Sequence, residues 1–339
     1  TDGASPGIKY VLQALIGGPY DGIMIPIPQY PLYSASIDLL GGAKIGYYLD
    51  EEKQWGFDIK ETRRAVAEAK QKGIAAKAIV FINPGNPTGN VMSDDDIRSA
   101  IELAKEENMV ILADEVYQQN IYGQNKKFSS FFKILNEMTA KDASYKQVEL
   151  VSYHSVSKGI FGECGLRGGY MHLCNVENSG YEELYKLVSI NLCPNTMGQC
   201  TVDLMCNHPK KGDDSYELFT SEYNDLFASL QRRANTLSKH LNEIEGISCQ
   251  NIEGAMYAFP TISLSKKAAE EARNKQMAPD ALYCFELLEK AGICCVPGSG
   301  FGQKDGTFHL RTTLLPPENE IQQVVERMAK FHKEFSARY

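Results

Sequence analysis

Short apolar runs alternate with helix-length segments through the first half of the chain. Each run is brief and rich in Val, Ile and Leu, as buried strands are, and six of them follow in order: 22–27, 44–49, 78–82, 110–113, 148–151 and 169–173. Strands separated by helices usually pair in parallel, so the pattern predicts an α/β domain with a mostly parallel sheet between two helical layers. Ligands bind outside the carboxyl ends of such strands, so polar residues there are the first site candidates.

The second half of the chain has a different pattern. A helix predicted over roughly 216–245 carries apolar residues at steps of three and four, as an interdomain helix would. Short strands and two further helices follow it. The predicted organisation is a large domain at 1–214, a long helix at 215–245 and a smaller α+β domain at 246–339.

Composition excludes several classes of function. The net charge of −8 argues against nucleic acid and anionic membranes as partners, and no apolar run reaches the roughly 20 residues that a membrane helix needs. Nine cysteines without C-x-x-C spacing predict reduced, mostly buried thiols in an intracellular compartment. We therefore expect a cytoplasmic protein, with the mitochondrion as the alternative. The six histidines lack metal-ligand spacing, so no metal site is predicted.

The turn at 83–89, N-P-G-N-P-T-G, is the most specific motif. Six fixed residues of this kind occur by chance in roughly one such chain in 10^5. Two prolines and two glycines lock a turn after a strand and present the Asn86 amide rigidly to an oxygen atom. A purely structural turn is the alternative.

Asp114 and Tyr117 follow the strand at 110–113. A buried carboxylate needs a partner, and a protonated ring nitrogen is a suitable one. Lys158 follows the next strand among Ser155, Ser157 and Gly159, where an amine is placed to condense with a carbonyl. Taken alone, this stretch is better explained by a solvated loop lysine, and only the rest of the chain reverses that interpretation.

Three further segments carry groups suited to anions or rings. Arg167 lies in a glycine-rich segment and with the nearby serines could hold a phosphate, while the turn at 3–7 opens a helix whose free N–H groups face an anion. Arg311 could grip a carboxylate with two parallel hydrogen bonds, and Tyr30 is fixed on a proline-rich loop just past a strand. The alternatives are a surface ion pair for Arg167, an ordinary capped turn at 3–7, an exposed strand face for Arg311 and a loop aromatic packed on the core for Tyr30.

Taken together, the strings resemble the pyridoxal-phosphate aminotransferases of fold type I over the whole chain. Those around Lys158 and at 254–260 are most similar to the alanine aminotransferases. The strings, in order, are G-A-S-P-G, P-x-Y-P-L-Y, N-P-G-N-P-T-G, D-E-V-Y, H-S-x-S-K-G, G-E-C-G-x-R-G-G, G-A-M-Y-A-F-P, P-G-S-G-F-G and H-x-R.

The resemblance implies a role for each candidate. Lys158 would hold pyridoxal 5′-phosphate covalently and move a proton, Asp114 would pair with the pyridine nitrogen, and Arg311 would take the substrate α-carboxylate. The other cofactor contacts are expected from Asn86 and Tyr117 to the ring's 3′ oxygen, from Tyr30 to the ring face, and from Ala4, Ser5, Ser155, Ser157 and Arg167 to the phosphate. The substrates would be an amino acid and a keto acid, most simply L-alanine and 2-oxoglutarate.

The resemblance also bears on the front of the chain. Members of the family have a substantial segment before the position of Thr1, which supplies part of the small domain, an arm across a homodimer and a tyrosine for the partner's phosphate site. We therefore expect the natural N-terminus to lie upstream, and a homodimer in the full-length protein.

Three other interpretations stay open. The string S-V-S-K matches S-x-x-K of serine β-lactamases, although S-D-N and K-T-G are absent. A transcription regulator can carry an aminotransferase-like ligand-binding module behind a DNA-binding domain. An enzyme with the same cofactor could have another outcome, as glutamate:glyoxylate aminotransferases, β-lyases and cyclising synthases do.

Overall fold

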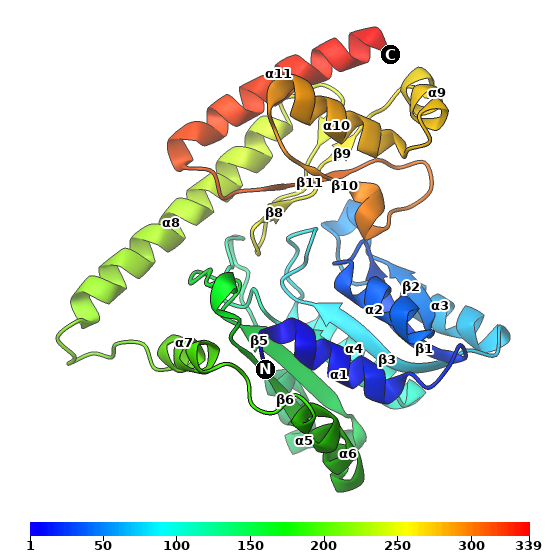
Figure 1. Cartoon of the computed structure of the whole chain (residues 1–339), viewed down its shortest axis with the longest axis vertical. Helices are drawn as coiled ribbons and strands as arrows, with labels where there is room; N and C mark the ends of the chain where they lie inside the picture. The colour runs from blue at the N-terminus through cyan, green and yellow to red at the C-terminus, as the bar shows by residue number, and fades with distance from the viewer.

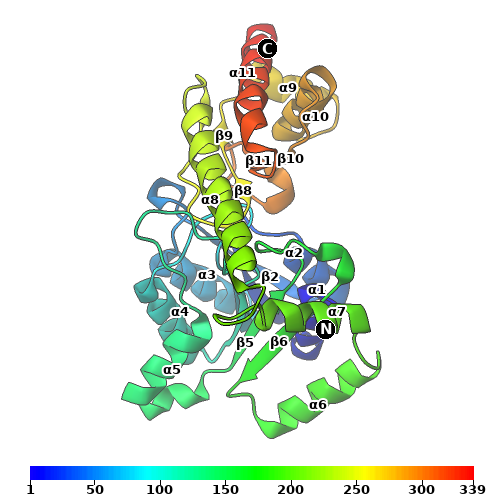
Figure 2. The same cartoon turned by 90° about the vertical axis from the view of Figure 1, so that its left-hand side faces the viewer.

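The computed structural model describes all residues, 1–339, and divides into two lobes (Figure 1). One lobe surrounds a six-stranded sheet, and the other holds two small sheets with the last helices. The long helix α8 (Tyr216–Leu241) runs between the lobes, as Figure 2 shows along its full length. The exact domain boundaries stay a prediction.

The large sheet has the strand order β2-β1-β3-β4-β5-β6. All neighbours are parallel except β5 and β6, so the predicted mostly parallel sheet is confirmed. The strands are β1 (Asp21–Ile27), β2 (Ala43–Tyr48), β3 (Ala75–Ile82), β4 (Val110–Asp114), β5 (Leu150–Ser155) and β6 (Gly169–Cys174).

Helices cover both faces of this sheet because its central strands are apolar on both sides. Along β3, Ile79 and Phe81 belong to one buried cluster and Ala78 and Val80 to the other. The first cluster includes α3 (Ile59–Gln71), α4 (Asp94–Glu107) and α5 (Phe131–Lys141), and the second includes α1 (Ala4–Leu15), α2 (Leu32–Leu40) and α6 (Asn178–Ser189). The predicted three-layer arrangement is therefore confirmed.

The smaller lobe is built on antiparallel strands and has its own core. The sheets have the orders β10-β11-β8 and β7-β9, and α8 buries Leu230, Ala234, Leu237 and Leu241 in that core. Its elements are β7 (Ile247–Ser248), β8 (Tyr257–Ala258), β9 (Thr261–Ile262), α9 (Lys266–Asn274), α10 (Pro279–Ala291), β10 (Val296–Pro297), β11 (Leu310–Thr313) and α11 (Ile321–Arg338), while α7 (Thr196–Cys206) precedes α8.

Side chains alternate along β11 and thereby join the two lobes. Leu310 and Leu314 enter the small core, whereas His309 and Arg311 point toward the large lobe. The His309 Nε2 atom lies 3.1 Å from Glu51 Oε1, so the segment that carries Arg311 is tied to the large lobe beside the site.

Two expectations from the sequence are wrong in detail. The strand predicted at 148–151 begins at Leu150 and continues to Ser155, so the serine lies in the strand itself. The nine cysteines are all free, but five are exposed and only two are buried, because most of them lie on α7 and in loops outside the cores. The exposed ones are Cys164, Cys193, Cys200, Cys206 and Cys294.

Candidate active site

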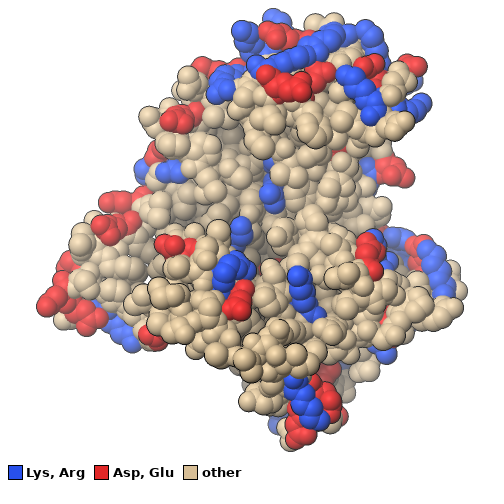
Figure 3. Space-filling view, in the orientation of Figure 1, with Lys and Arg blue, Asp and Glu red and all other residues tan.

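All eleven residues singled out in the sequence line one cavity of about 360 Å³ between the lobes. Figure 3 shows Lys and Arg side chains near the middle of this face, where the lobes meet. The sequence-predicted lining residues are Ala4, Ser5, Tyr30, Asn86, Asp114, Tyr117, Ser155, Ser157, Lys158, Arg167 and Arg311. They meet because most of them follow the carboxyl ends of neighbouring strands or the start of α1.

Asp114 ends β4 and is 5% exposed. Its Oδ2 atom accepts a hydrogen bond from the Tyr33 hydroxyl at 3.0 Å, whereas its buried Oδ1 atom has no partner. Burial raises the pKa of Asp114 to about 6, although the Tyr33 hydroxyl and the backbone N–H of Val116 oppose this. A buried carboxylate with one unpartnered oxygen on a cavity wall favours a cationic donor as its ligand.

Four polar side chains form a hydrogen-bonded chain across the cavity wall. Arg311 Nη1 donates to Asn86 Oδ1 at 3.0 Å, and Asn86 Nδ2 lies 3.4 Å from the Tyr117 hydroxyl. The hydroxyl of Tyr257 lies 3.0 Å from that of Tyr117. The sequence predicts no role for Tyr257, because nothing in its string G-A-M-Y-A-F-P indicates a contact with a residue 140 positions earlier.

Arg167 and the start of α1 form the anion-binding side of the cavity. Arg167 Nη1 lies 3.3 Å from Ser157 Oγ, and Nη2 donates to the Asp2 carbonyl at 3.0 Å. A Cβ atom on Gly3 would lie 2.4 Å from Arg167 Nη2, and Gly3 has a φ of +85°, so only glycine leaves space for the guanidinium here. Gly3 is also the N-cap of α1, whose first N–H groups are free for an anion.

Lys158 lies three residues beyond the end of β5 and lines the same cavity as Asp114. Tyr30 follows β1 on the Gln29–Pro31 loop and is 40% exposed at the cavity. An amine, a free carboxylate oxygen and an aromatic ring therefore share one space, as a bound aromatic aldehyde would require.

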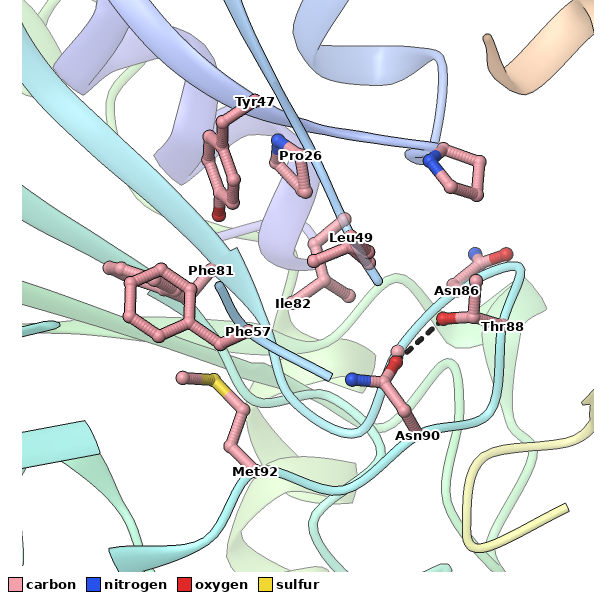
Figure 4. A pocket seen from close by; sticks show the side chains of 12 residues that line it. Pro26, Tyr47, Leu49, Phe57, Phe81, Ile82, Asn86, Thr88, Asn90 and Met92 are labelled. Atoms are coloured by element: carbon pink, nitrogen blue, oxygen red, sulfur yellow. Dashed lines mark hydrogen bonds between the residues drawn. The ribbon is translucent and has the colours of Figure 1, made fainter. Parts of the chain in front are cut away.

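A second, much smaller cavity of about 20 Å³ lies behind Asn86 (Figure 4). Tyr47, Phe57 and Phe81 lie on one side of it, and a 2.6 Å hydrogen bond from Thr88 to Asn90 lies on the other. Its volume suffices for about one water molecule, so this cavity is too small to bind a substrate.

Comparison with known proteins identifies the family. Residues 1–328 match the model of aminotransferase class I and II. The chain belongs to this family.

Members of the class I and II aminotransferases include close relatives of this chain. A probable mitochondrial alanine aminotransferase of Dictyostelium discoideum is 51% identical over the whole chain, and glutamate–glyoxylate aminotransferase 2 of Arabidopsis thaliana is 48% identical. The chain spans 63% of the first relative's length and 70% of the second's. The solved structure of an alanine aminotransferase from Pyrococcus furiosus superposes with a TM-score of 0.82 at 28% identity, over 98% of this chain and 75% of that one. The predicted fold is therefore confirmed.

The family implies pyridoxal 5′-phosphate, and the residues present fit it. The volume of about 360 Å³ lies within the range of small-molecule sites. The unpartnered Asp114 Oδ1 suits a protonated ring nitrogen, the Gly3–Arg167 corner suits a phosphate, and Lys158 supplies an amine. No group of three or more His, Cys, Asp or Glu side chains is arranged to hold a metal ion, and none of the helices combines the length and apolarity of a membrane span.

Proposed function

We propose that this chain carries the active site of a pyridoxal-phosphate aminotransferase that moves the amino group of L-alanine to 2-oxoglutarate, giving pyruvate and L-glutamate. The observation that carries the proposal is the free Oδ1 atom of Asp114 on the same cavity as Lys158. The names of the alanine aminotransferase relatives support the choice of substrates.

The cofactor, when bound, supplies an electron sink for charge that develops at the substrate Cα atom. Asp114 would hold the ring nitrogen in its protonated form, and Asn86 and Tyr117 would donate hydrogen bonds to the ring's 3′ oxygen. Tyr30 would pack on the ring face. The phosphate would be bound by the Ala4 N–H group, Ser5, Ser155, Ser157 and Arg167.

Two side chains would act on the substrate. Lys158 would hold the cofactor covalently through its amine, and the same amine, when free, would take up the proton that leaves the substrate Cα atom and give it back later in the reaction. Arg311 would bind the α-carboxylate through two N–H groups, and its Nε atom is buried without a partner in the protein. Because Arg311 comes from the small lobe, movement of that lobe would close the site over the carboxylate and exclude water.

The covalent role of Lys158 can be tested directly in the full-length protein. Wild-type protein should absorb visible light and keep its cofactor after borohydride reduction and denaturation. Lys158→Ala should lose both properties and transamination, whereas Lys186→Ala, which removes an exposed lysine paired with Glu183, should keep them. Retained turnover in Lys158→Ala would contradict the mechanism.

Glutamate:glyoxylate aminotransfer is the second candidate function. The 48% identity to a glutamate–glyoxylate aminotransferase is close to the 51% identity to the alanine aminotransferase. Initial rates with L-alanine or L-glutamate against 2-oxoglutarate, pyruvate and glyoxylate separate the two. A kcat/KM at least tenfold higher for glyoxylate than for 2-oxoglutarate would favour the second candidate.

A homodimer is the proposed assembly. Seven large apolar side chains that are at least half exposed lie within the segment 181–218, and contact between two copies of the chain there would remove them from water. They are Tyr181, Tyr185, Ile190, Leu192, Met197, Leu204 and Leu218. Light scattering of the full-length protein should give twice the mass of one chain, and a monomer at micromolar concentration would contradict this assembly.

The cytoplasm is the proposed compartment, because nine free thiols suit a reducing environment. The mitochondrion is the alternative, supported by the name of the Dictyostelium relative. A fluorescent fusion to the C-terminus of the natural protein distinguishes them.

A further inference from the structure

Tyr257 touches both halves of the cavity wall. It begins β8 in the small lobe, is 6% exposed, and reaches the large lobe, where its hydroxyl lies 3.0 Å from that of Tyr117. The two rings meet edge-on, with centroids 5.7 Å apart. Pairing of Tyr257 with Thr313 on β11 fixes its backbone, so the hydroxyl contact is held by the sheet rather than by a loop.

The hydrogen-bond directions along this wall follow from donor chemistry. A guanidinium can only donate, so the bond from Arg311 fixes Oδ1 of Asn86 toward Arg311 and leaves Nδ2 to donate to Tyr117. The Tyr117 oxygen thus accepts from Asn86, and its second neighbour is the Tyr257 hydroxyl. If Tyr257 also donates, both lone pairs of Tyr117 are used, and its single proton is left for an acceptor in the cavity that Tyr117 lines.

Tyr117 is able to keep that proton. Burial and the adjacent Tyr257 raise its pKa well above the ordinary value, so it remains a neutral donor throughout the physiological range. Its proton is then available to an acceptor in the cavity, and an accepted bond from Tyr257 strengthens that donation.

The ring of Tyr257 has a second contact that is independent of its hydroxyl. The Arg311 guanidinium carbon lies 4.4 Å from the Tyr257 ring centroid and 4.8 Å from that of Phe301. Both distances are within the range of cation–π attraction, so two aromatic rings orient the guanidinium.

We infer that Tyr257 is a positioning residue that links the two functions of the wall: its hydroxyl aims the Tyr117 proton into the cavity, and its ring aims Arg311 at a carboxylate. The inference rests on the proposed function and deepens it. It assigns the strength of the Tyr117 hydrogen bond to the cofactor to the Tyr257 hydroxyl, and the affinity for the substrate carboxylate to the Tyr257 ring.

Two substitutions separate these parts. Tyr257→Phe removes only the hydroxyl, so Tyr117 loses one donor and itself donates more weakly to the 3′ oxygen of the bound cofactor. The pH midpoint at which the cofactor's visible absorption band changes should therefore rise by about 0.5–1 pH unit. The KM of this variant for L-alanine should change less than about threefold. Tyr257→Leu also removes the ring, so its KM for L-alanine should be about five- to tenfold higher than that of Tyr257→Phe. The fall in kcat should be smaller than this rise in KM.

Phe301→Leu is the matched control, because Phe301 contacts Arg311 but has no hydroxyl to share with Tyr117. It should raise KM without moving the spectral midpoint. An unchanged midpoint in Tyr257→Phe would overturn the role of the hydroxyl, and equal KM values for the Phe and Leu variants would overturn the role of the ring.

Propanoate binding, measured by calorimetry on the full-length protein, tests the ring without any reaction. A five- to tenfold loss of propanoate affinity in Tyr257→Leu supports the contact with Arg311, and no loss contradicts it. If that loss occurs in a protein that shows no visible band and no transamination, the proposed function fails while the assignment of the Tyr257 ring to Arg311 stands.

Discussion

Replacing Asp114 with Asn should weaken binding of pyridoxal phosphate by about a hundredfold at pH 7.5. Burial raises the pKa of this carboxyl from 3.8 to about 6. That difference corresponds to roughly 3 kcal/mol of solvation that the ionised group lacks in the folded protein. A protonated ring nitrogen beside the unpartnered Oδ1 can restore a similar amount, and roughly 3 kcal/mol is about a hundredfold in Kd.

The same substitution should remove one step of the pH dependence. Pairing with the protonated ring nitrogen would lower the pKa of the Asp114 carboxyl in the complex. Below pH 6 this carboxyl is protonated in the unliganded protein and must lose its proton before it can pair with the ring nitrogen. At pH 5 about nine-tenths of the unliganded carboxyl is protonated, and wild-type affinity loses about a factor of ten that the Asn variant does not lose. The ratio of the two Kd values should therefore fall from about 100 at pH 7.5 to about 10 at pH 5.

The assay is a fluorescence titration of cofactor-free protein with pyridoxal phosphate at both pH values. The titration of the free cofactor is common to both measurements and cancels in the ratio. Glu115→Gln is the matched control, because Glu115 is the adjacent buried acid but accepts from the Phe131 N–H group and does not line the cavity. A ratio that stays the same at both pH values, or an Asn variant that binds as tightly as wild type, would refute the reasoning.

Three further outcomes are expected. Arg311→Ala should raise KM for L-alanine at least tenfold with the cofactor retained, as the visible spectrum will report; loss of cofactor would mean that Arg311 is misassigned. Burial raises the pKa of Glu115 to about 8 from 4.5, so its carboxyl contributes stability below pH 4.5 that is lost as pH rises toward 8. Glu115→Gln should thus gain stability over wild type between pH 5 and 8, by up to roughly 1.4 kcal/mol per pH unit in chemical denaturation, and parallel curves would contradict this. Ser93→Ala breaks the capping box of α4 and should lower stability by about 1 kcal/mol, while Ser93→Asp should restore most of it.

The sequence predicted most of the large lobe because its information there is local. An apolar run such as 110–113 needs no distant partner to be recognised as a buried strand, and β4 occupies Val110–Asp114. Once the strands are parallel, their carboxyl ends must meet, so Asn86, Asp114 and Lys158 come together without any knowledge of their contacts. The antiparallel direction of β6 is also local in origin: between Ser155 and Gly169 the chain forms only a short 3₁₀ turn, which cannot serve as a parallel crossover.

Contacts between the lobes could not be predicted in this way. β8 has only two residues, too few for a periodic pattern, and its Tyr257 meets a tyrosine from the other lobe. His309 is a polar residue beside a short strand, yet it is 1% exposed because Phe259 stacks on it and Glu51 reaches it from the large lobe. Burial of this kind depends on how two separately folded surfaces fit, and no single segment encodes it.

The lobe-crossing contacts of Arg311 and Tyr257 are mechanically dependent on one another. Arg311 lies on β11 and Tyr257 on β8, and these strands are paired through Thr312–Ala258 and Thr313–Tyr257. Their partners Asn86 and Tyr117 both follow strands of the rigid central sheet. A displacement of the small lobe that lengthens the Arg311–Asn86 bond must therefore also disturb the hydroxyl contact of Tyr257. Carboxylate binding at Arg311 and proton donation by Tyr117 thus respond to the same motion, so a substrate that draws the small lobe inward tightens both at once.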